Sequence, residues 1–600
     1  ELTSKLQTAK DEGRYQIELG TKGNNLSASV KKQIEDCNLT GIEFVESNSR
    51  YYPLGDFCSY VVGYAKSYND QSVKKMVGEM GLELSYDKQL KGKNGYKVYQ
   101  TDANGYALVD GTLREKDPTN GNDLYLTIDS GLQRNLDYLM SNAYSESGAE
   151  VVTAGVMEIK TGKILAMSTY PSFNPNERNI STFNNYFLEG TIECGSVFKP
   201  FIYSDSIEEG KYDHNAYYNS GSYNVYYGNK LVATIKDHNG GQGWGTITYD
   251  QGLYHSSNVA ICNLLDQGYV TKDVLTEKLN DLGFFQGDTM DGLTCSSSIN
   301  AYTRKNAGRL EYLTTGFGQG STVTPYQLLK AYSVFGNDGK TVQPHIVDKV
   351  VNPETNKVVY QATPKYSKQI FSTNTISQVK DLMLGVIEDE QGTGKTYRLD
   401  NDVRMIGKTG TGQVVENGGY STTLYMHSFV GIAPYDDPQV VMFLTFKSGD
   451  SYAQYMPNIV KQTMNEALQV VNRYNAKNTT AVDQSYTLDS YTNQSVNYVK
   501  SKLESKSLSV QIIGNGSSVI EQYPLAKSKV TSGDKVFIKT EGKDITLPNL
   551  IGWSKKEVQT YASLAGIQLT IDGTSGHVTA QSVGENAVVH SGDSLTVAIS

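Results

Sequence analysis

Cysteine is scarce in this sequence of 600 residues: there are 5, an odd number, and no two of them form a Cys-x-x-Cys pattern. At least one thiol must therefore be unpaired, and the spacing implies no disulfide framework. The 7 histidines form neither a His-Glu-x-x-His nor a His-x-His pattern. Because catalytic zinc is normally held by ligands at such spacings, we expect no metal site and no cofactor.

Long apolar runs and basic clusters are also missing. No stretch of about 18 consecutive apolar residues occurs, so no segment has the length of a membrane-spanning helix. The chain begins at Glu1 rather than at Met, and we expect that an N-terminal membrane anchor has been removed. The formal net charge is −10 and no basic run is present. This argues against a nucleic-acid partner, because phosphate binding depends on clustered lysine and arginine.

What is present is the composition of a folded, multidomain protein. Hydrophobic residues make up 38% of the chain and charged residues 20%, which differs from the weakly apolar, highly charged composition of disordered chains. The length exceeds what one hydrophobic core organises. At roughly 100 to 200 residues per domain, it indicates about three to five domains.

The last part of the chain contains an internal repeat. Residues 530–536 (VTSGDKV) resemble residues 589–595 (VHSGDSL), 59 positions later. In each copy a helical stretch precedes alternating, strand-like residues, at 508–513 and at 567–571. We therefore expect two small α+β modules, at 485–541 and 542–600.

Two further domains are expected before this repeat. Alternation over 124–128 predicts a strand and apolar spacing over 132–143 predicts a helix, so a domain boundary lies near residue 120. Helical stretches then mix with strand-like segments, which indicates an α/β or α+β domain of catalytic size. Residues before the boundary have short strand-like runs and no catalytic constellation, which predicts a β-rich pedestal. The expected ranges are 1–118 for the pedestal, 119–472 for the catalytic domain and 473–484 for a polar linker, with strands in the catalytic domain at 154–158, 164–167, 428–432 and 440–445.

Three short patterns carry candidate chemistry, in the order Ser196-x-x-Lys199, Ser256-Ser257-Asn258 and Lys408-Thr409-Gly410. Each pattern is weak alone, because similar ones recur elsewhere in the chain. Order, spacing and flanking residues must therefore decide. The recurrences are Ser29/Lys32, Ser72/Lys75 and Ser532/Lys535 for the first pattern, Ser172–Asn174 and Ser298–Asn300 for the second, and Lys160–Gly162 for the third.

The flanks of the first pattern favour a nucleophile. Gly195 precedes Ser196, as expected where a helix N-terminus presents a hydroxyl to a substrate. Positions i and i+3 share a helix face, so Lys199 is expected to reach the Ser196 hydroxyl as its base. An ordinary lysine is protonated at pH 7, so this role requires a pKa lowered by burial or by a second cation. Lys408 is the expected second cation.

These flanks resemble those of the class B penicillin-binding proteins, the monofunctional transpeptidases of wall synthesis. The resemblance covers nearly the whole chain, and it places the terminal repeat with PASTA modules and the chain with the septal transpeptidases of Gram-positive bacteria. It implies a penicillin-binding/β-lactamase-like serine transpeptidase domain. The segments that carry it are 49–53, 81–92, 161–167, 171–175, 193–200, 244–245, 256–260, 318–320, 324–325, 408–411, 418–420 and 547–552.

The resemblance also implies a mechanism. Ser196 would attack the penultimate carbonyl of a D-Ala-D-Ala stem peptide while Lys199 takes its proton. Ser256 would relay a proton to the leaving amine, and Asn258 would hydrogen-bond the substrate backbone. An amine of a neighbouring strand would then resolve the acyl-enzyme, and a β-lactam would acylate Ser196 in place of the substrate.

The remaining implied roles concern binding. Lys408 would attract the substrate carboxylate, helped by the hydroxyls of Thr409 and Thr411, with Gly410 in the same substrate-binding segment. The backbone N–H groups of Ser196 and Thr411 would form the oxyanion hole. The expected partners are peptidoglycan stem peptides, β-lactams, a separate glycosyltransferase and other division proteins.

Two residues depart from the usual pattern of the family. Cys194 stands where proline is frequent, and Gly412 follows Thr411 where alanine is usual. Cys194 is either an inert small side chain or an oxidation-sensitive thiol. Gly412 is expected to loosen the edge of its strand.

Several alternatives stay open. The first and third patterns could be an ordinary surface helix pair and a turn. A β-lactamase or DD-carboxypeptidase shares the acyl-serine step, although the deacylating Glu-x-x-Leu-Asn pattern is absent, Glu277 to Asn280 being one residue short. A catalytically weak wall-binding scaffold or β-lactam sensor would acylate without cross-linking. The terminal modules either bind muropeptide or serve as spacers.

Overall fold

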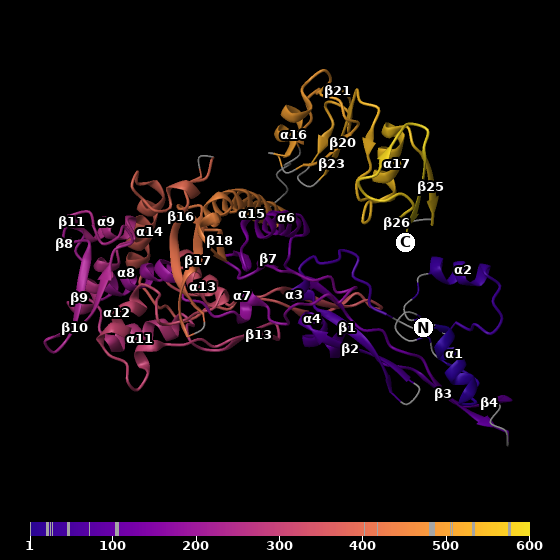
Figure 1. Ribbon diagram of the computed structural model, residues 1–600, viewed down its shortest axis with the longest axis horizontal. Helices are drawn as coiled ribbons and strands as arrows, with labels where there is room; N and C mark the ends of the chain where they lie inside the picture. The colour runs from indigo at the N-terminus through magenta and orange to yellow at the C-terminus, as the bar shows by residue number, and fades with distance from the viewer. Residues whose placement is uncertain are drawn as a thin grey trace. The chain divides into compact units, whose positions relative to one another are not determined.

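The chain forms two compact units, Glu1–Tyr52 with Val62–Gly121, and Pro53–Val61 with Asn122–Ser600. The computed structural model is drawn in Figure 1. It describes residues 2–17, 19, 23, 26, 28–44, 49–70, 73–102, 107–400, 403–416, 418–478, 486–504, 506, 508–530, 534–573 and 578–599.

The first unit is built from short helices and two antiparallel hairpins, β1 with β2 and β3 with β4. Arg50 forms an ion pair of 3.0 Å with Glu83, and the hydroxyl of Tyr52 accepts a hydrogen bond from the backbone N–H of Ala65 at 2.7 Å. These contacts connect the segment before the first hairpin to α4 and to β1, and the β-rich pedestal expected from the sequence is confirmed. The elements are α1 (Leu2–Asp11), α2 (Ala28–Asp36), β1 (Tyr64–Asp70), β2 (Val73–Met80), α4 (Gly81–Ser85), α5 (Asp87–Leu90), β3 (Tyr96–Thr101) and β4 (Ala107–Lys116).

The centre of the second unit is a five-stranded antiparallel sheet with the strand order β16-β17-β18-β6-β7. Strand β16, which carries Lys408, Thr409, Gly410 and Thr411, is at one edge. On its outer side no other described strand of this sheet pairs with its backbone N–H and C=O groups. The strands are β6 (Val151–Glu158), β7 (Ile164–Tyr170), β16 (Ile406–Glu416), β17 (Gly419–Ala433) and β18 (Val440–Ser448).

The two faces of this sheet pack against different helices. Alternate residues of a strand point to opposite faces. Along β18, Val440, Met442, Leu444 and Phe446 belong to one core cluster with residues of α6 (Ser130–Ser147) and α15 (Met456–Asn478). On the opposite face, α13 (Pro325–Tyr332) packs against β18 and β6, and the 3-10 turn η2 (Gly195–Phe198) packs against β16.

Further helices and hairpins surround the catalytic sheet. A second sheet has the order β15-β14-β5, and three two-stranded sheets pair β8 with β11, β9 with β10 and β12 with β13. The helices include α8, whose residues from Lys199 to Ile207 are all buried. The remaining elements are α3 (Ser59–Val62), β5 (Asp123–Leu126), α7 (Tyr186–Glu189), α8 (Lys199–Glu208), β8 (Tyr217–Asn219), β9 (Ser222–Tyr227), β10 (Lys230–Lys236), β11 (Thr246–Thr248), α9 (Tyr249–Tyr254), α10 (Asn258–Asp266), α11 (Lys272–Asp281), β12 (Asp288–Met290), β13 (Leu293–Cys295), η3 (Ala301–Thr303), α12 (Arg309–Gly316), η4 (Ser333–Gly336), β14 (Val347–Asn352), β15 (Lys357–Gln361), α14 (Thr373–Glu388), η5 (Lys395–Tyr397) and η6 (Asp450–Gln454).

The C-terminal repeat forms two modules of the same topology. In each, a helix accompanies a three-stranded sheet whose central strand has one parallel and one antiparallel neighbour. The two modules share a core, since Ile513 and Phe537 of the first belong to the cluster of the second. The expected α+β modules are therefore confirmed. The elements are β19 (Tyr486–Thr487), α16 (Val496–Glu504), β20 (Ser509–Ile513), β21 (Val519–Tyr523), β22 (Lys529–Val530), β23 (Lys535–Thr540), β24 (Ile545–Thr546), α17 (Lys555–Ala565), β25 (Gln568–Asp572), β26 (Val578–Gln581), β27 (Val588–Val589) and β28 (Ser594–Ile599).

The secondary structure agrees with most of the segments expected from the sequence. The strands at 154–158, 164–167, 428–432 and 440–445 lie within β6, β7, β17 and β18, and the helix at 132–143 lies within α6. Residues 473–478 of the expected linker are instead the end of α15, and residues 479–484 lie outside the described residues. Among the described residues, no helix combines the length and apolar character needed to cross a bilayer.

Candidate active site

The fold brings the three sequence patterns together at Ser256. The side-chain nitrogen of Lys408 donates to the Ser256 hydroxyl at 2.8 Å, across 152 positions of sequence. The side-chain nitrogen of Lys199 lies 2.5 Å from the Ser256 carbonyl oxygen and 3.4 Å from its hydroxyl, across 57 positions. The site is thus assembled from η2 and α8, the turn before α10, and the edge strand β16.

Ser196 lies in a 3-10 turn whose geometry requires the preceding glycine. Gly195 has φ +62°, and a Cβ atom there would lie 2.3 Å from the carbonyl oxygen of Thr411. The backbone N–H of Gly195 donates to the Gly318 carbonyl at 3.0 Å. Ser196 follows as the first partly exposed residue of a buried segment. The turn therefore lies against the backbone of β16 with Ser196 partly exposed.

Lys199 begins α8 and is fully buried. Burial lowers the pKa of Lys199 to about 7, although the Asp237 carboxylate acts in the opposite direction. Its side-chain nitrogen also donates to Asn258 Oδ1 at 2.8 Å. Among the described residues its hydrogen-bond partners are Ser256 and Asn258, so the expected direct bond to the Ser196 hydroxyl is not observed. A neutral amine with two donated hydrogen bonds keeps its lone pair available as a base.

Lys408 is equally buried. Burial first, and then the neighbouring Lys199, lower the pKa of Lys408 well below its ordinary value. Besides Ser256, its amine donates to the carbonyl oxygen of Thr409 at 3.0 Å. Two buried lysines that contact the same residue disfavour a second positive charge, because each cation makes it harder to charge the other.

The turn that carries Ser256 is strained and is held by a carboxylate that sequence analysis missed. Ser256 has φ +59°, an uncommon conformation for a residue with a side chain. Asp237 Oδ1 accepts from the Ser257 hydroxyl at 2.9 Å and from the backbone N–H groups of Asn258 and Val259 at 2.7 and 3.1 Å. Asp237 thereby neutralises the N-terminus of α10 and fixes the turn. No motif spacing points to Asp237, since it contacts the turn from a separate loop.

The amide of Asn258 is oriented from both ends. Its oxygen accepts from Lys199, and its nitrogen donates to the carbonyl of Lys236 at 2.9 Å. The amide nitrogen carries two hydrogens and uses one of them in this contact, so the second is available to a ligand. Asn258 is therefore fixed with a donor for a ligand.

Strand β16 packs closely against the segment that carries the proposed nucleophile Ser196 (residues 193–198, the nucleophile turn). A Cβ atom on Gly410 would lie 2.6 Å from the Cys194 carbonyl oxygen, and one on Gly412 would lie 1.7 Å from that of Glu193. The expectation that Gly412 loosens the strand edge is wrong, because this glycine permits the close approach. On the other face, the Thr409 hydroxyl donates to that of Thr393 at 2.9 Å, a partner that sequence analysis also missed.

Cys194 itself is 1% exposed, and burial raises the pKa of its thiol. Its sulfur lies 3.8 Å from the carbonyl oxygen of Gly195. A buried thiol with a raised pKa has little thiolate, so these observations favour the inert interpretation over the oxidation-sensitive one.

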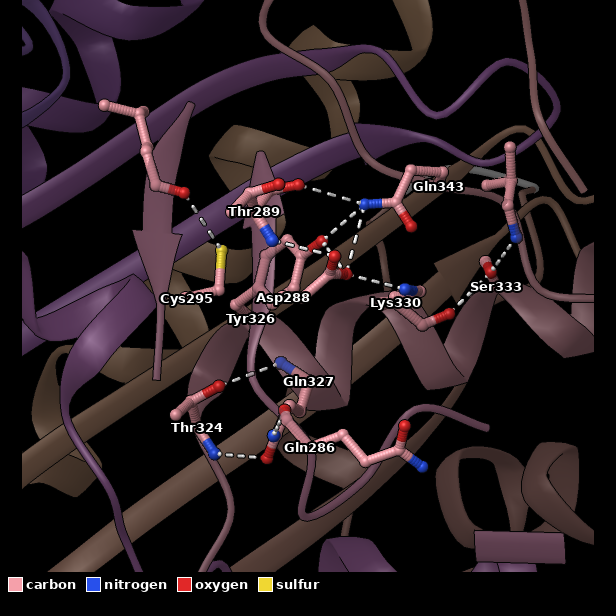
Figure 2. A network of polar contacts seen from close by, with 12 residues as sticks. Gln286, Asp288, Thr289, Cys295, Thr324, Tyr326, Gln327, Lys330, Ser333 and Gln343 are labelled. Carbon is pink, nitrogen blue, oxygen red and sulfur yellow. Dashed lines mark hydrogen bonds and ion pairs between the residues drawn. The ribbon is translucent and has the colours of Figure 1, made fainter. Parts of the chain in front are cut away.

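A polar network around Asp288 holds helix α13, which contacts the nucleophile turn. Asp288 accepts hydrogen bonds from Tyr326 at 2.8 Å, Lys330 at 2.7 Å and Gln343 at 3.1 Å, as Figure 2 shows. It thereby holds α13, whose last residue Tyr332 donates to the Val197 carbonyl at 2.5 Å. The helix starts with a capping box of Thr324 and Gln327 and with Pro325 in its first turn.

In the part of the chain that the structure describes, no group of three His, Cys, Asp or Glu residues could hold a metal ion. The groups gathered at this site are the partly exposed Ser196, the two buried amines of Lys199 and Lys408, the hydroxyl of Ser256 and the edge strand β16.

Comparison with known proteins gives the same assignment. A family model of the penicillin binding protein transpeptidase domain matches residues 152–469, and one of the penicillin-binding protein dimerisation domain matches residues 1–126. The PASTA domain model matches residues 486–542 and 545–600.

Individual proteins are similar over most of their length. The chain is 30% identical over 543 residues to stage V sporulation protein D of Bacillus subtilis, across 87% of this chain and 80% of that protein. It is 28% identical over 439 residues to the peptidoglycan D,D-transpeptidase FtsI homolog of Mesostigma viride, across 69% and 70%. The crystal structure of penicillin binding protein 2X from Streptococcus thermophilus superposes with a TM-score of 0.66 at 25% identity, covering 98% of this chain and 89% of that one. The chain therefore belongs to the class B penicillin-binding proteins, with a dimerisation domain, a transpeptidase domain and two PASTA domains.

Proposed function

We propose that this protein is a peptidoglycan D,D-transpeptidase that cross-links stem peptides through an acyl-enzyme on Ser196. One observation carries the assignment of residues: two fully buried lysines, Lys199 and Lys408, both contact Ser256, and Lys199 follows Ser196 by one helical turn. Relatives that match over most of their length are D,D-transpeptidases by name, which supports the same reaction.

In the first step Lys199 acts as the base. With a pKa of about 7, a substantial fraction of Lys199 is neutral at pH 7, and its lone pair takes the proton of the Ser196 hydroxyl. The serine oxygen bonds to the penultimate D-Ala carbonyl carbon. When the tetrahedral intermediate collapses, the bond to the terminal D-Ala nitrogen breaks and that nitrogen takes up a proton.

Ser256 is placed to deliver this proton. Its hydroxyl lies between the amines of Lys408 and Lys199, at 2.8 and 3.4 Å. The Ser256 hydroxyl would pass its own proton to the leaving nitrogen and recover one from Lys199. In the second step the sequence runs in reverse: an acceptor amine loses a proton to the same relay and attacks the acyl carbon, which releases Ser196.

The oxyanion hole is assigned to the backbone N–H groups of Ser196 and Thr411. The Ser196 N–H is in the first turn of η2, where helical N–H groups lack intrahelical partners. Thr411 is on the edge strand, and its peptide lies against Gly195. Removing one donor of such a pair costs about 3 to 4 kcal/mol in comparable sites.

Lys408, Thr409, Gly410 and Thr411 form the proposed binding strand for the substrate. An arriving carboxylate would stabilise the protonated form of Lys408, whose burial otherwise disfavours it. The Thr409 and Thr411 hydroxyls would add hydrogen bonds, and the free donor of Asn258 would bind the peptide backbone. Substrate binding and the protonation of Lys408 would thus be coupled.

We place this reaction on the outer side of the cytoplasmic membrane, where stem peptides are cross-linked, and in wall synthesis for cell division. β-Lactams would acylate Ser196 in place of the substrate. The glycan strands would come from a separate glycosyltransferase, and other division proteins are expected partners. The alternatives are a DD-carboxypeptidase and a catalytically weak scaffold or β-lactam sensor.

Intact mass after incubation with a penicillin tests the proposal. The wild-type protein should gain one penicillin per chain, and Ser196→Ala should gain none. Ser29→Ala, in another Ser-x-x-Lys pattern, is the control and should acylate normally. A wild-type protein that stays unmodified while folded would contradict the acyl-serine assignment and favour the scaffold.

A further inference from the structure

The carboxylate of Glu193 joins three parts of the active site. Glu193 lies three residues before Ser196 and is 8% exposed. Its Oε1 atom accepts a hydrogen bond from the hydroxyl of Tyr420, on β17, at 3.1 Å. The backbone N–H of Gly320 also donates to this carboxylate. One side chain thus connects the nucleophile turn to the β16–β17 hairpin and to the loop after α12.

Backbone hydrogen bonds connect the same turn to one neighbouring segment of the chain. Ile192 and Val323 exchange two hydrogen bonds, of 2.8 and 2.9 Å, and the Gly195 N–H donates to Gly318 at 3.0 Å. These bonds fix the turn to the segment 318–323. They do not fix it to strand β16, which the turn meets through van der Waals contact of Glu193 with Gly412 and of Gly195 with Thr411.

The proposed oxyanion hole depends on the contact between the nucleophile turn and strand β16. One of its N–H groups belongs to Ser196 in the turn, and the other belongs to Thr411 in the strand. Two donors serve one oxygen only if their separation is fixed before the reaction. Glu193 links the turn to the sheet, because its backbone belongs to the turn and its carboxylate accepts a hydrogen bond from Tyr420. Tyr420 is on β17, the strand that pairs with β16.

The arrangement is not the one that stability alone would favour. Glu193 Oε2 is buried and has no hydrogen-bond partner among the described residues. Burial raises the pKa of Glu193, and the hydrogen bonds from Gly320 and Tyr420 oppose this shift. A buried acceptor without a partner destabilises a fold, so this carboxylate costs stability where it stands.

We propose, resting on the function proposed above, that Glu193 is a positioning residue for catalysis. Its carboxylate holds the nucleophile turn at the distance from β16 at which the N–H groups of Ser196 and Thr411 bind one oxyanion. Tyr420 is the partner through which it does so. Glu193 does not touch the substrate in this account and acts through the two donors.

The test separates affinity from the rate of acylation. For Glu193→Ala, Glu193→Gln, Tyr420→Phe and the wild type, stopped-flow measurement with a chromogenic cephalosporin gives the binding constant and the acylation rate constant. Thermal unfolding is measured alongside. Tyr312→Phe is the control, since its hydroxyl donates to Val270 elsewhere in the domain. A boronic acid, whose tetrahedral serine adduct presents an oxygen anion, reports directly on the oxyanion hole.

We expect Glu193→Ala to slow acylation by about 30-fold, less than the loss of a complete donor, with the binding constant for the cephalosporin unchanged. Boronate affinity should fall in parallel. Glu193→Gln keeps an oxygen acceptor and should recover most of the rate, while Tyr420→Phe should lose about five-fold.

Wild-type rates and boronate affinity in both Glu193→Ala and Tyr420→Phe would overturn the proposal while leaving the proposed function intact. A Glu193→Ala protein that only unfolds, with Tyr420→Phe at the wild-type rate, would also overturn it. A wild-type protein that does not acylate at all would overturn the proposed function and this inference with it.

Discussion

Gly412 and Glu193 are in such close contact that a Cβ atom on Gly412 would lie 1.7 Å from the Glu193 carbonyl oxygen. Alanine is usual at this position in the family that the sequence resembles. In this chain the glycine lets β16 approach the nucleophile turn, so the departure from the usual residue is part of the geometry of the site.

The first prediction concerns this contact. Gly412→Ala must push β16 away from the turn, since backbone atoms cannot yield as a flexible side chain does. We expect acylation by a penicillin to slow by about ten-fold or more, because the Thr411 donor moves with the strand. Gly419→Ala is the matched control, as nothing lies within 4 Å of a Cβ atom built there. Equal rates for the two variants would contradict the prediction.

The second prediction is the pH dependence of acylation. Burial lowers the pKa of Lys199 to about 7, so the amine is protonated and inactive as a base at lower pH. The acylation rate should therefore rise with pH and reach half its plateau near pH 7. Stopped-flow acylation from pH 5 to pH 9 measures this profile. A rate that is independent of pH over this range would exclude Lys199 as the base.

Asp237 provides the third prediction. Its carboxylate favours the protonated form of Lys199, so its removal should lower the pKa of Lys199 further. In Asp237→Asn, which keeps an acceptor for the turn before α10, the midpoint of the acylation profile should move down by about one pH unit. Asp348→Asn, whose carboxylate pairs with Lys163 at 3.2 Å, serves as the control and should leave the midpoint in place. An upward shift in Asp237→Asn would contradict the account.

The fourth prediction concerns stability and Asp205. This residue lies on α8 and is fully buried, and within the part of the chain that the structure describes neither carboxylate oxygen has a hydrogen-bond partner. Burial raises the pKa of Asp205 well above its ordinary value. The folded state therefore holds a proton that the unfolded state releases above about pH 4, and this residue's contribution to stability falls as the pH rises from there toward the folded pKa.

Asp205→Leu should therefore stabilise the protein against urea at pH 8, by about 1 to 3 kcal/mol. The gain should be smaller at pH 5, where the unfolded chain also holds more of the proton. Unfolding curves of wild type and variant at the two pH values check this. A larger gain at pH 5 than at pH 8 would show that the sign of the linkage is wrong.

Local sequence predicted many of the elements and the fold class of this protein, for physical reasons. Apolar periodicity is strong in the strands β6 and β18 and in the helix α6. The repeat at an offset of 59 residues predicted the two terminal modules. The end of α15 was not expected, because residues 473–478 are polar and lack the spacing of an apolar face. A helix continued from a packed segment needs no such signal.

The spacing of the motifs predicted the three segments that meet at the site, but no residues outside those segments. The three patterns meet, and the roles given to their residues remain proposals. Asp237, Thr393 and Glu193 were missed because each acts through a contact between distant segments, and no residue pattern encodes such contacts. The expected hydrogen bond between Lys199 and Ser196 was inferred from ideal helix geometry. It is not observed, because the amine of Lys199 donates to Ser256 and Asn258 instead.

In a transpeptidase the acyl group on Ser196 passes to an amine. Incubation of the protein with a stem pentapeptide ending in D-Ala-D-Ala and an amine acceptor, followed by mass spectrometry of the products, measures this transfer. We expect release of D-Ala and a cross-linked product in the wild type, and neither in Ser196→Ala. Release of D-Ala with only the hydrolysed tetrapeptide would show that the protein is a carboxypeptidase and not a transpeptidase.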